Sequence, residues 1–187
     1  MNKVLAVLFA IVVVAATVGP ATAGERTRTV FITGSSHTGN LGGLTGADKE
    51  CQAEADAPGS LVPSGTYRAW LSDGQESPQT RFTKALDPYV LPDGTTIADG
   101  FPDLTHGYIK HPINIDPTGM RVGRVLFWTG TNADGTSVSA FVTCDGWTIE
   151  DTSGGVAGST LETDALWSAY RGGLPCSRRA RLACFQQ

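Results

Sequence analysis

Hydrolytic chemistry needs a nucleophile beside a base, and the sequence contains serines, carboxylates and three histidines, His37, His106 and His111. The G-x-S-x-G segment that presents a serine nucleophile is missing, because the nearest segment, Gly154-Gly-Val-Ala-Gly158, has no serine at its centre. His37 lies in a Gly- and Ser-rich stretch, and the other two histidines lie beside irregular turns. We therefore expect loop or surface histidines rather than a general base, and a protein that is not an enzyme. A secreted hydrolase is the alternative.

Arginines are the clearest indication of a binding partner. Residues 165–187 contain no acidic residue but carry four arginines: Arg171, Arg178, Arg179 and Arg181. Planar guanidinium groups suit sulfate, phosphate or carboxylate groups, because they offer paired hydrogen bonds. We expect these arginines, together with a partly exposed Trp167, to contact an anionic ligand. A solvated, salt-bridged strand edge is the alternative interpretation.

Metal chemistry has weaker support. Oxygen-bearing side chains in Asn132-Ala-Asp-Gly135, together with Asp145, are of the kind that Ca²⁺ prefers, but the segment lacks the spacing and the bidentate glutamate of an EF-hand. A plain hairpin turn explains the Asp-Gly pair adequately and is the preferred interpretation. Zinc would need close cysteine pairs such as C-x-x-C, which this sequence does not contain. We therefore expect no metal or other cofactor.

The four cysteines have another use. They are Cys51, Cys144, Cys176 and Cys184. An even number of cysteines in an exported chain favours two disulfides, for which three pairings are possible. Cys51 recurs with Ala47 and Ala55 on what we expect to be the buried stripe of a helix, and Cys184 lies on the inward face of the expected last strand.

The export prediction rests on residues 1–23. Lys3 precedes an apolar run over residues 4–18, Gly19-Pro20 interrupts it, and Ala21-Thr-Ala23 has the small-x-small pattern of a cleavage site. A spanning helix needs about 20 apolar residues, so a cleaved signal peptide fits better than an anchor. We expect one domain at residues 24–187, secreted or extracellular (periplasmic or cell-surface locations included), with no membrane insertion after cleavage.

The acidic balance excludes one further class of partner. The whole chain has 18 acidic against 14 basic residues, which argues against binding to nucleic acid.

Hydrophobic patterning predicts the elements that must position these residues. Two short helices are expected: one is capped by Thr45 and Asp48 and ends near Pro58-Gly59, and the other begins after Ser77 and ends near Leu86. Alternating or apolar runs predict strands over residues 28–33, 66–72, 89–91, 95–97, 125–129, 137–144 and 179–184. Helices come early and hairpins and long loops late, and the first and last strands are able to pair. This order predicts an α+β domain with an antiparallel sheet.

Several segments, in order along the chain, resemble a known family. They are Gly39-Asn-Leu-Gly-Gly-Leu-Thr-Gly-Ala-Asp48, Gly65-Thr-Tyr-Arg-Ala-Trp-Leu-Ser72, Trp128-Thr-Gly-Thr-Asn-Ala-Asp-Gly135 and the cysteines with the terminal Ala-Cys-Phe run. Together they resemble endostatin, and still more closely a family of uncharacterised secreted bacterial domains. The resemblance extends over roughly residues 30–187.

The resemblance implies a C-type-lectin-like fold with two short helices, long loops and nested disulfides, Cys51–Cys184 and Cys144–Cys176. It also implies binding to anionic glycans, because endostatin-like domains bind heparan sulfate through arginines. The family's metal sites do not carry over. Leu91-Pro-Asp93 and Gly146-Trp-Thr148 lack the calcium ligands of lectins of this fold, and no histidine lies near the mature start.

These observations together predict a secreted, non-catalytic domain that binds an extracellular or cell-surface ligand, either a protein or an anionic glycan. A structural surface or matrix protein is a third possibility beside the hydrolase.

Overall fold

The structure is a computed structural model that describes residues 26–187. The signal peptide expected at residues 1–23 lies outside these residues. Within residues 26–187 no helix combines the length and apolar content needed to cross a membrane.

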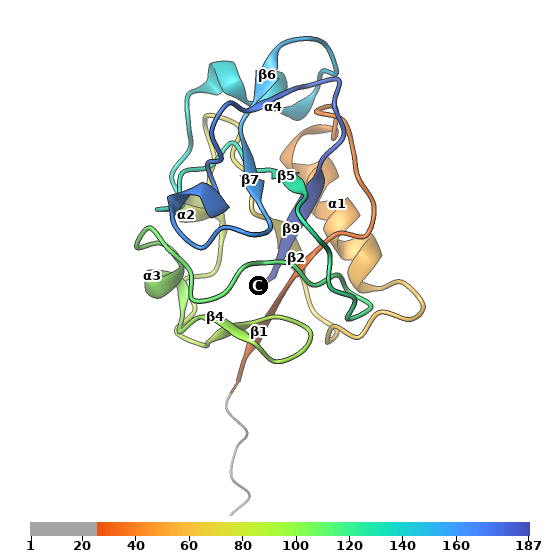
Figure 1. The fold of residues 1–187 in the computed structure, drawn as a ribbon, viewed down its shortest axis with the longest axis vertical. Coiled ribbons are helices and arrows are strands. Elements are labelled where there is room, and N and C mark those ends of the chain that lie inside the picture. The colour runs from red at the N-terminus through yellow and green to blue at the C-terminus, as the bar shows by residue number, and fades with distance from the viewer. Residues whose placement is uncertain (1–25) are drawn as a thin grey trace, which may run out of the picture.

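The longest strand, β9 (Arg181–Gln186), runs through the middle of a curled sheet (Figure 1). β1 (Arg28–Ile32) pairs antiparallel along one edge of β9, as expected for the first and last strands. β2 (Tyr67–Ala69) and β5 (Leu126–Trp128) share the other edge, β2 antiparallel and β5 parallel. Residues 182–185 are all buried, because alternate side chains of β9 lie in the two apolar clusters that cover its two faces.

Three more strands extend this sheet, and their directions correct one prediction. β3 (Tyr89–Val90) and β4 (Thr96–Ala98) form the expected hairpin, and β7 (Ala157–Ser159) pairs with β5. β3 is parallel to β1 and β5 is parallel to β9, so the prediction of a wholly antiparallel sheet is wrong and the sheet is mixed. The physical reason is chain length, because the long segments between these strands allow crossovers that a hairpin does not.

A separate two-stranded sheet joins β6 (Gly154–Gly155) to β8 (Leu174–Pro175).

The first helix, α1 (Gly43–Ala55), packs against β2 and β9. The predicted cap at Thr45 is wrong, because the helix begins after Gly42, whose φ of 74° is left-handed and suits glycine. Asp48 instead accepts a hydrogen bond from the Ala69 N–H (2.9 Å) and pairs with Arg81. Burial raises the pKa of the Asp48 carboxyl above its usual value, although Arg81 acts in the opposite direction. Asp48 thus ties the helix to β2 and to the next turn of chain.

The remaining helices are single turns. They are α2 (Pro78–Arg81), α3 (Phe101–Leu104), α4 (Cys144–Trp147) and the 3-10 turns η1 (Ala140–Val142) and η2 (Ala165–Trp167). α2 begins after Ser77 as expected but ends at Arg81 rather than near Leu86. The predicted strand over residues 137–144 is wrong: Ser137 and Thr143 form only isolated bridges, with Thr131 and Gly155, and η1 lies between them. The description as two short helices is therefore corrected to one full helix and several short turns.

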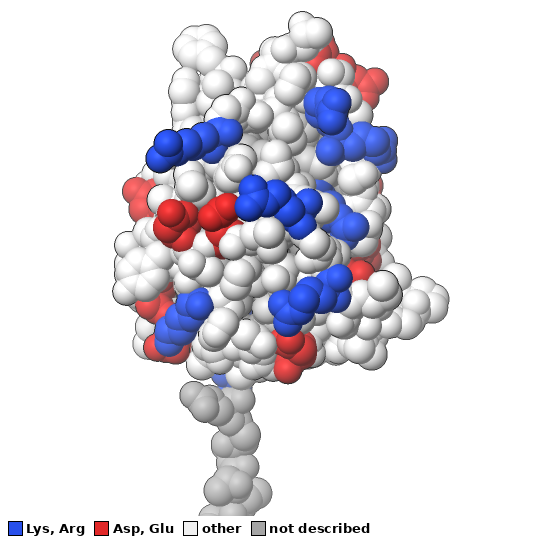
Figure 2. All heavy atoms as spheres, in the orientation of Figure 1, with Lys and Arg blue, Asp and Glu red and all other residues white. Residues whose placement is uncertain are grey.

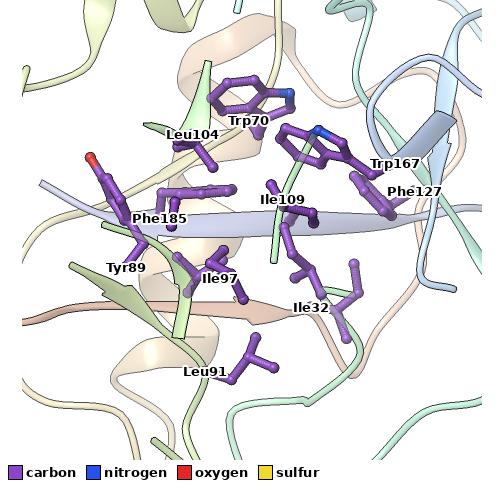
Figure 3. Close-up of a cluster of buried hydrophobic side chains, with 14 of the residues drawn as sticks. Ile32, Trp70, Tyr89, Leu91, Ile97, Leu104, Ile109, Phe127, Trp167 and Phe185 are labelled. Atoms are coloured by element: carbon purple, nitrogen blue, oxygen red, sulfur yellow. The ribbon is translucent and has the colours of Figure 1, made fainter. Parts of the chain in front are cut away.

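Two apolar clusters and two disulfides hold the fold together. One cluster gathers Trp70, Trp167 and Phe185 beside β9 (Figure 3). The other contains Trp128, Trp147 and all four cysteines. Cys51–Cys184 joins α1 to β9 and Cys144–Cys176 joins α4 to the segment after β8, the nested pairing that the resemblance implies. The bridges span 133 and 32 residues, for which the chain-entropy model gives about 3.5–5 kcal/mol each.

Candidate functional site

Three of the four predicted arginines meet at one open hollow of about 360 Å³. Arg178 and Arg179 precede β9, and Arg181 is its first residue. The remaining walls come from Ser36, Ala180 and the aliphatic side chains Val125, Leu126 and Leu174. We call this feature the arginine hollow. It combines guanidinium hydrogen-bond donors with aliphatic walls.

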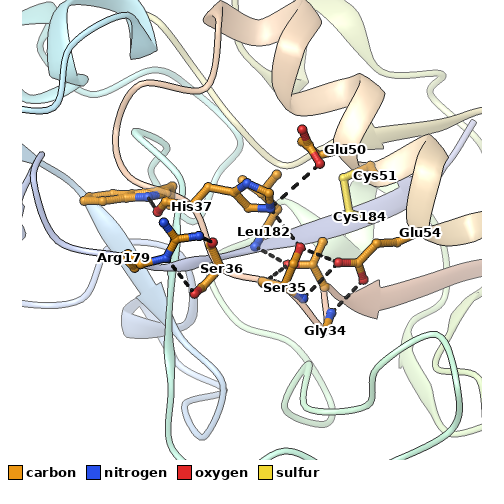
Figure 4. Close-up of polar contacts among 12 residues, drawn as sticks. Gly34, Ser35, Ser36, His37, Glu50, Cys51, Glu54, Arg179, Leu182 and Cys184 are labelled. Carbon is orange, nitrogen blue, oxygen red and sulfur yellow. Dashed lines mark hydrogen bonds and ion pairs between the residues drawn. A yellow bond between two sulfur atoms is a disulfide. The ribbon is translucent and has the colours of Figure 1, made fainter.

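Backbone carbonyls of the loop after β1 hold two of these arginines. The Ser36 carbonyl accepts a hydrogen bond from Arg179 Nη2, and Ser36 Oγ lies 3.3 Å from Arg179 Nε (Figure 4). Arg181 Nη1 donates to the Thr33 carbonyl at 2.6 Å. Neutral acceptors position the guanidinium groups without neutralising their charge, so each retains donors for an anion.

Among residues 26–187, no acidic residue forms an ion pair with the arginines of the hollow. Ion pairs within residues 26–187 involve other cations, and none includes Arg171, Arg178, Arg179 or Arg181. Figure 2 shows Lys and Arg side chains spread over one face of the molecule, with acidic side chains beside only some of them. Of the alternative interpretation, a solvated, salt-bridged strand edge, the salt bridges are absent among the described residues, whereas Arg171, Arg178 and Arg179 are indeed exposed to solvent.

The other two residues of the predicted ligand set lie elsewhere. Arg171 is exposed but does not line the hollow. Trp167 is only 1% exposed, and its ring centroid lies 4.9 Å from that of Trp70 (Figure 3). The prediction of a partly exposed Trp167 is therefore wrong. The short turn η2, where Asp164 Oδ1 accepts from the Leu166 N–H, directs the indole into the core, where burial of its large apolar surface is favourable.

A second polar group lies on the other side of the same loop (Figure 4). Ser35 Oγ is 2.8 Å from His37 Nε2 and 2.5 Å from Glu54 Oε1, and His37 Nε2 is 4.0 Å from Glu50 Oε2. Sequence reasoning missed this group. The available indication was Glu50 and Glu54, one helical turn apart on α1 and therefore on one face.

The hydrogen bonds of this group argue against a serine nucleophile. Glu54 accepts from the Gly34 N–H (2.6 Å), the Ser35 N–H (2.9 Å) and the Ser35 hydroxyl. Ser35 Oγ donates its one proton to Glu54 Oε1, so this proton points away from His37 Nε2, the base that a serine nucleophile would need. The two N–H groups nearest the hydroxyl, which an oxyanion would need, are already bound. The arrangement fixes the loop on α1.

Residues 26–187 contain no group of three or more His, Cys, Asp or Glu side chains arranged to hold an ion. In the segment considered for calcium, Asp134 Oδ1 accepts from Thr136 N and Oγ1, and the Gly135 N–H donates to the Asn132 carbonyl. These are the bonds of a turn.

Comparison with known proteins identifies a family. Residues 34–164 match the model of the family described as "Protein of unknown function (DUF1554)". The matched part includes the loop after β1, α1 and β5, and it ends before the arginines of the hollow. A search of curated proteins gave no match. Because the family model covers more than half of the sequence, the chain belongs to the DUF1554 family.

Proposed function

We propose that this chain is a secreted, non-catalytic binding domain of C-type-lectin-like fold, which contacts an extracellular or cell-surface ligand, a protein or an anionic glycan, through the arginine hollow. The mixed α+β architecture, the curled sheet and the nested disulfides support the fold assignment. Two disulfides with no free cysteine among the described residues are typical of proteins in oxidising compartments.

One observation carries the binding proposal: three guanidinium groups share a hollow without an acidic partner among residues 26–187. Such a hollow matches a ligand that presents sulfate, phosphate or carboxylate groups, since each guanidinium is able to donate two parallel hydrogen bonds to one of them. Arg179 and Arg181 are already anchored on carbonyls, so binding requires little further ordering of their long side chains. The aliphatic walls exclude water from the contact.

Heparin affinity tests the proposal, with arginine variants matched for exposure. Arg178 and Arg171 are both exposed and form no ion pair within the described residues, but only Arg178 lines the hollow. We expect Arg178→Gln to weaken heparin binding about tenfold, because a hydrogen bond to a charged group contributes roughly 1.5–3 kcal/mol. Arg171→Gln should change binding by less than about threefold, the effect of distant charge alone. The measurement is titration calorimetry at low and physiological salt.

Equal losses in the two variants would reduce the effect to net charge and overturn the hollow as the site. Failure of the wild-type chain to bind heparin even at low salt would remove the anionic-glycan form of the proposal.

A hydrolase is the second candidate. The observation in its favour is that a histidine, a serine and carboxylates are in mutual contact near the surface, at Ser35, His37 and Glu54. The Ser35 hydroxyl proton is donated to Glu54 rather than to His37, which counts against a serine nucleophile. Binding is therefore the first proposal.

A further inference from the structure

Phe141 is 92% exposed, more than any other large apolar side chain within residues 26–187. It lies in η1, between exposed Ala140 and half-buried Val142. Leaving an aromatic ring in water forgoes the favourable burial that every tryptophan of this protein obtains.

The backbone behind Phe141 is fixed in a costly conformation. Cys144, Asp145 and Trp147 all have left-handed φ angles, of 51°, 50° and 67°, although none is a glycine. The Cys144–Cys176 disulfide and the hydrogen bond from Trp147 Nε1 to the Ser72 carbonyl (2.7 Å) hold this turn in place. Next to Phe141, the Val142 carbonyl accepts from the Val156 N–H at 2.9 Å. Phe141 is thus presented on a rigid support.

A small apolar pocket of about 160 Å³ lies beside this support. Its walls consist mostly of glycine and valine: Val142, Gly154, Gly155, Val156, Gly172 and Gly173. A Cβ added at Gly154 or Gly172 would meet no atom within 4 Å, so a side chain has room at either of these two lining positions. An apolar cavity of about 150 Å³ is known to accept benzene, and this glycine pocket therefore has the size for one phenyl ring.

The charged residues beside Phe141 and beside the glycine pocket indicate which molecule supplies the phenyl ring. Exposed Asp145 borders a shallow hollow together with Phe141, and exposed Arg171 directly precedes Gly172 of the glycine pocket. Neither forms an ion pair within residues 26–187. The surface thus carries an apolar tip with a negative neighbour and an apolar pocket with a positive neighbour. A two-fold contact between identical surfaces needs this kind of self-complementarity.

We propose that two copies of this chain associate about a two-fold axis, with Phe141 of each copy in the glycine pocket of the other. Asp145 then faces the partner's Arg171, and the same pair forms twice. The arginine hollow takes no part in this contact, so a failure to dimerise would leave the proposed function untouched. Because Arg171 does take part, its role as the control for heparin binding is measured at concentrations where the protein is a monomer.

Sedimentation velocity of the exported protein, over a concentration series from about 1 µM to 1 mM, tests the association. We expect a reversible monomer–dimer equilibrium in the wild type. Phe141→Ser should raise the dissociation constant at least about tenfold, as loss of a central aromatic contact does. Leu86→Ser, at another highly exposed apolar residue (79%), is the matched control and should leave the equilibrium unchanged.

A second variant tests the pocket independently. Gly154→Val fills the space where a Cβ has no neighbours, in a strand where valine is favourable, so it should fold and should also weaken the dimer at least about tenfold. Mixing the two variants restores one of the two ring–pocket contacts, because Phe141→Ser retains the pocket and Gly154→Val retains the ring. We expect the mixture to associate more tightly than either variant alone.

A wild-type chain that stays monomeric at all these concentrations would overturn the proposal, as would a dimer that Phe141→Ser and Gly154→Val leave intact.

Discussion

Ser35 lies between Glu54 and His37, and its hydrogen bonds to Glu54 indicate a structural role for the residue. The Gly34 N–H donates to Glu54 Oε2. The Ser35 hydroxyl and the Ser35 N–H both donate to the other carboxylate oxygen, Oε1. The next residue, Ser36, holds Arg179 on the opposite side of the loop. At the scale of single residues, the Ser35–Glu54 bonds therefore hold the loop that carries Ser36, and Ser36 in turn anchors Arg179 of the arginine hollow.

Replacing Ser35 by alanine distinguishes a support from a nucleophile. We expect Ser35→Ala to lower the free energy of unfolding by about 1 kcal/mol, because one hydrogen bond to a charged group is lost at an exposed site. We also expect a fluorophosphonate probe to leave wild-type Ser35 unlabelled, since its proton and the neighbouring N–H groups are already bound. Mass spectrometry after labelling and urea denaturation are the measurements. Labelling of the wild type that disappears in Ser35→Ala would favour the hydrolase.

At the scale of elements, the glycine-rich loop before α1 is held against the late loops. The Gly39 N–H donates to the Cys176 carbonyl (2.7 Å) and the Leu41 N–H to the Trp147 carbonyl (2.9 Å). A Cβ at Gly39 would lie 2.5 Å from Cys144 Sγ and 3.0 Å from Cys176 Cβ. Close approach to the disulfide thus explains why a residue without a side chain is needed at Gly39.

Gly39→Ala should destabilise the protein by about 1–3 kcal/mol, the usual cost of overpacking, because neither the disulfide nor the backbone there has room to shift. Gly123→Ala is the matched control. A Cβ at Gly123 meets nothing within 4 Å, so this variant should change the stability by no more than about 0.5 kcal/mol. Thermal and urea unfolding give both values. Equal stability of the two variants would show that the loop does not press on the disulfide as described.

At the scale of the whole molecule, the two apolar clusters each bury a tyrosine. Tyr67 and Tyr89 are each 1% exposed, in different clusters. Burial raises the pKa of both phenols from 10.0 to about 12, because the phenolate would lose its hydration. The folded state therefore holds these protons more tightly than the unfolded state does.

Raised pKa values predict an alkaline loss of stability. The contribution is fully present below pH 10, the unfolded value, and is lost as the pH rises through about 12, the folded value. We expect the urea midpoint to fall over this interval, and to fall less steeply in Tyr89→Phe, which has no phenol to ionise. Denaturation curves at a series of alkaline pH values, compared with tyrosinate absorbance, provide the measurement. Identical slopes in wild type and variant would contradict this account.

Local patterns in the sequence predicted the elements whose own residues determine them. Alternation was sufficient to predict strands at β1 and β9, and the Pro-Asp-Gly turn was sufficient to predict the β3–β4 hairpin. Alternation did not predict that both faces of β1 and β9 are buried. Cysteine number predicted two disulfides, and the clustering of arginines in residues 165–187 indicated a basic surface.

Tertiary contacts decided the rest. The segment expected as a strand over residues 137–144 became η1 and α4, because the disulfide and the buried Trp147 outweigh its local preference. Trp167 packs against Trp70 in the core, and Gly42 rather than Thr45 is the N-cap residue of α1. Above all, the chain alone did not show that Arg178, Arg179 and Arg181 share one hollow, or that Ser35 meets Glu54. These contacts join residues far apart in sequence, and only the folded backbone brings them within hydrogen-bond distance.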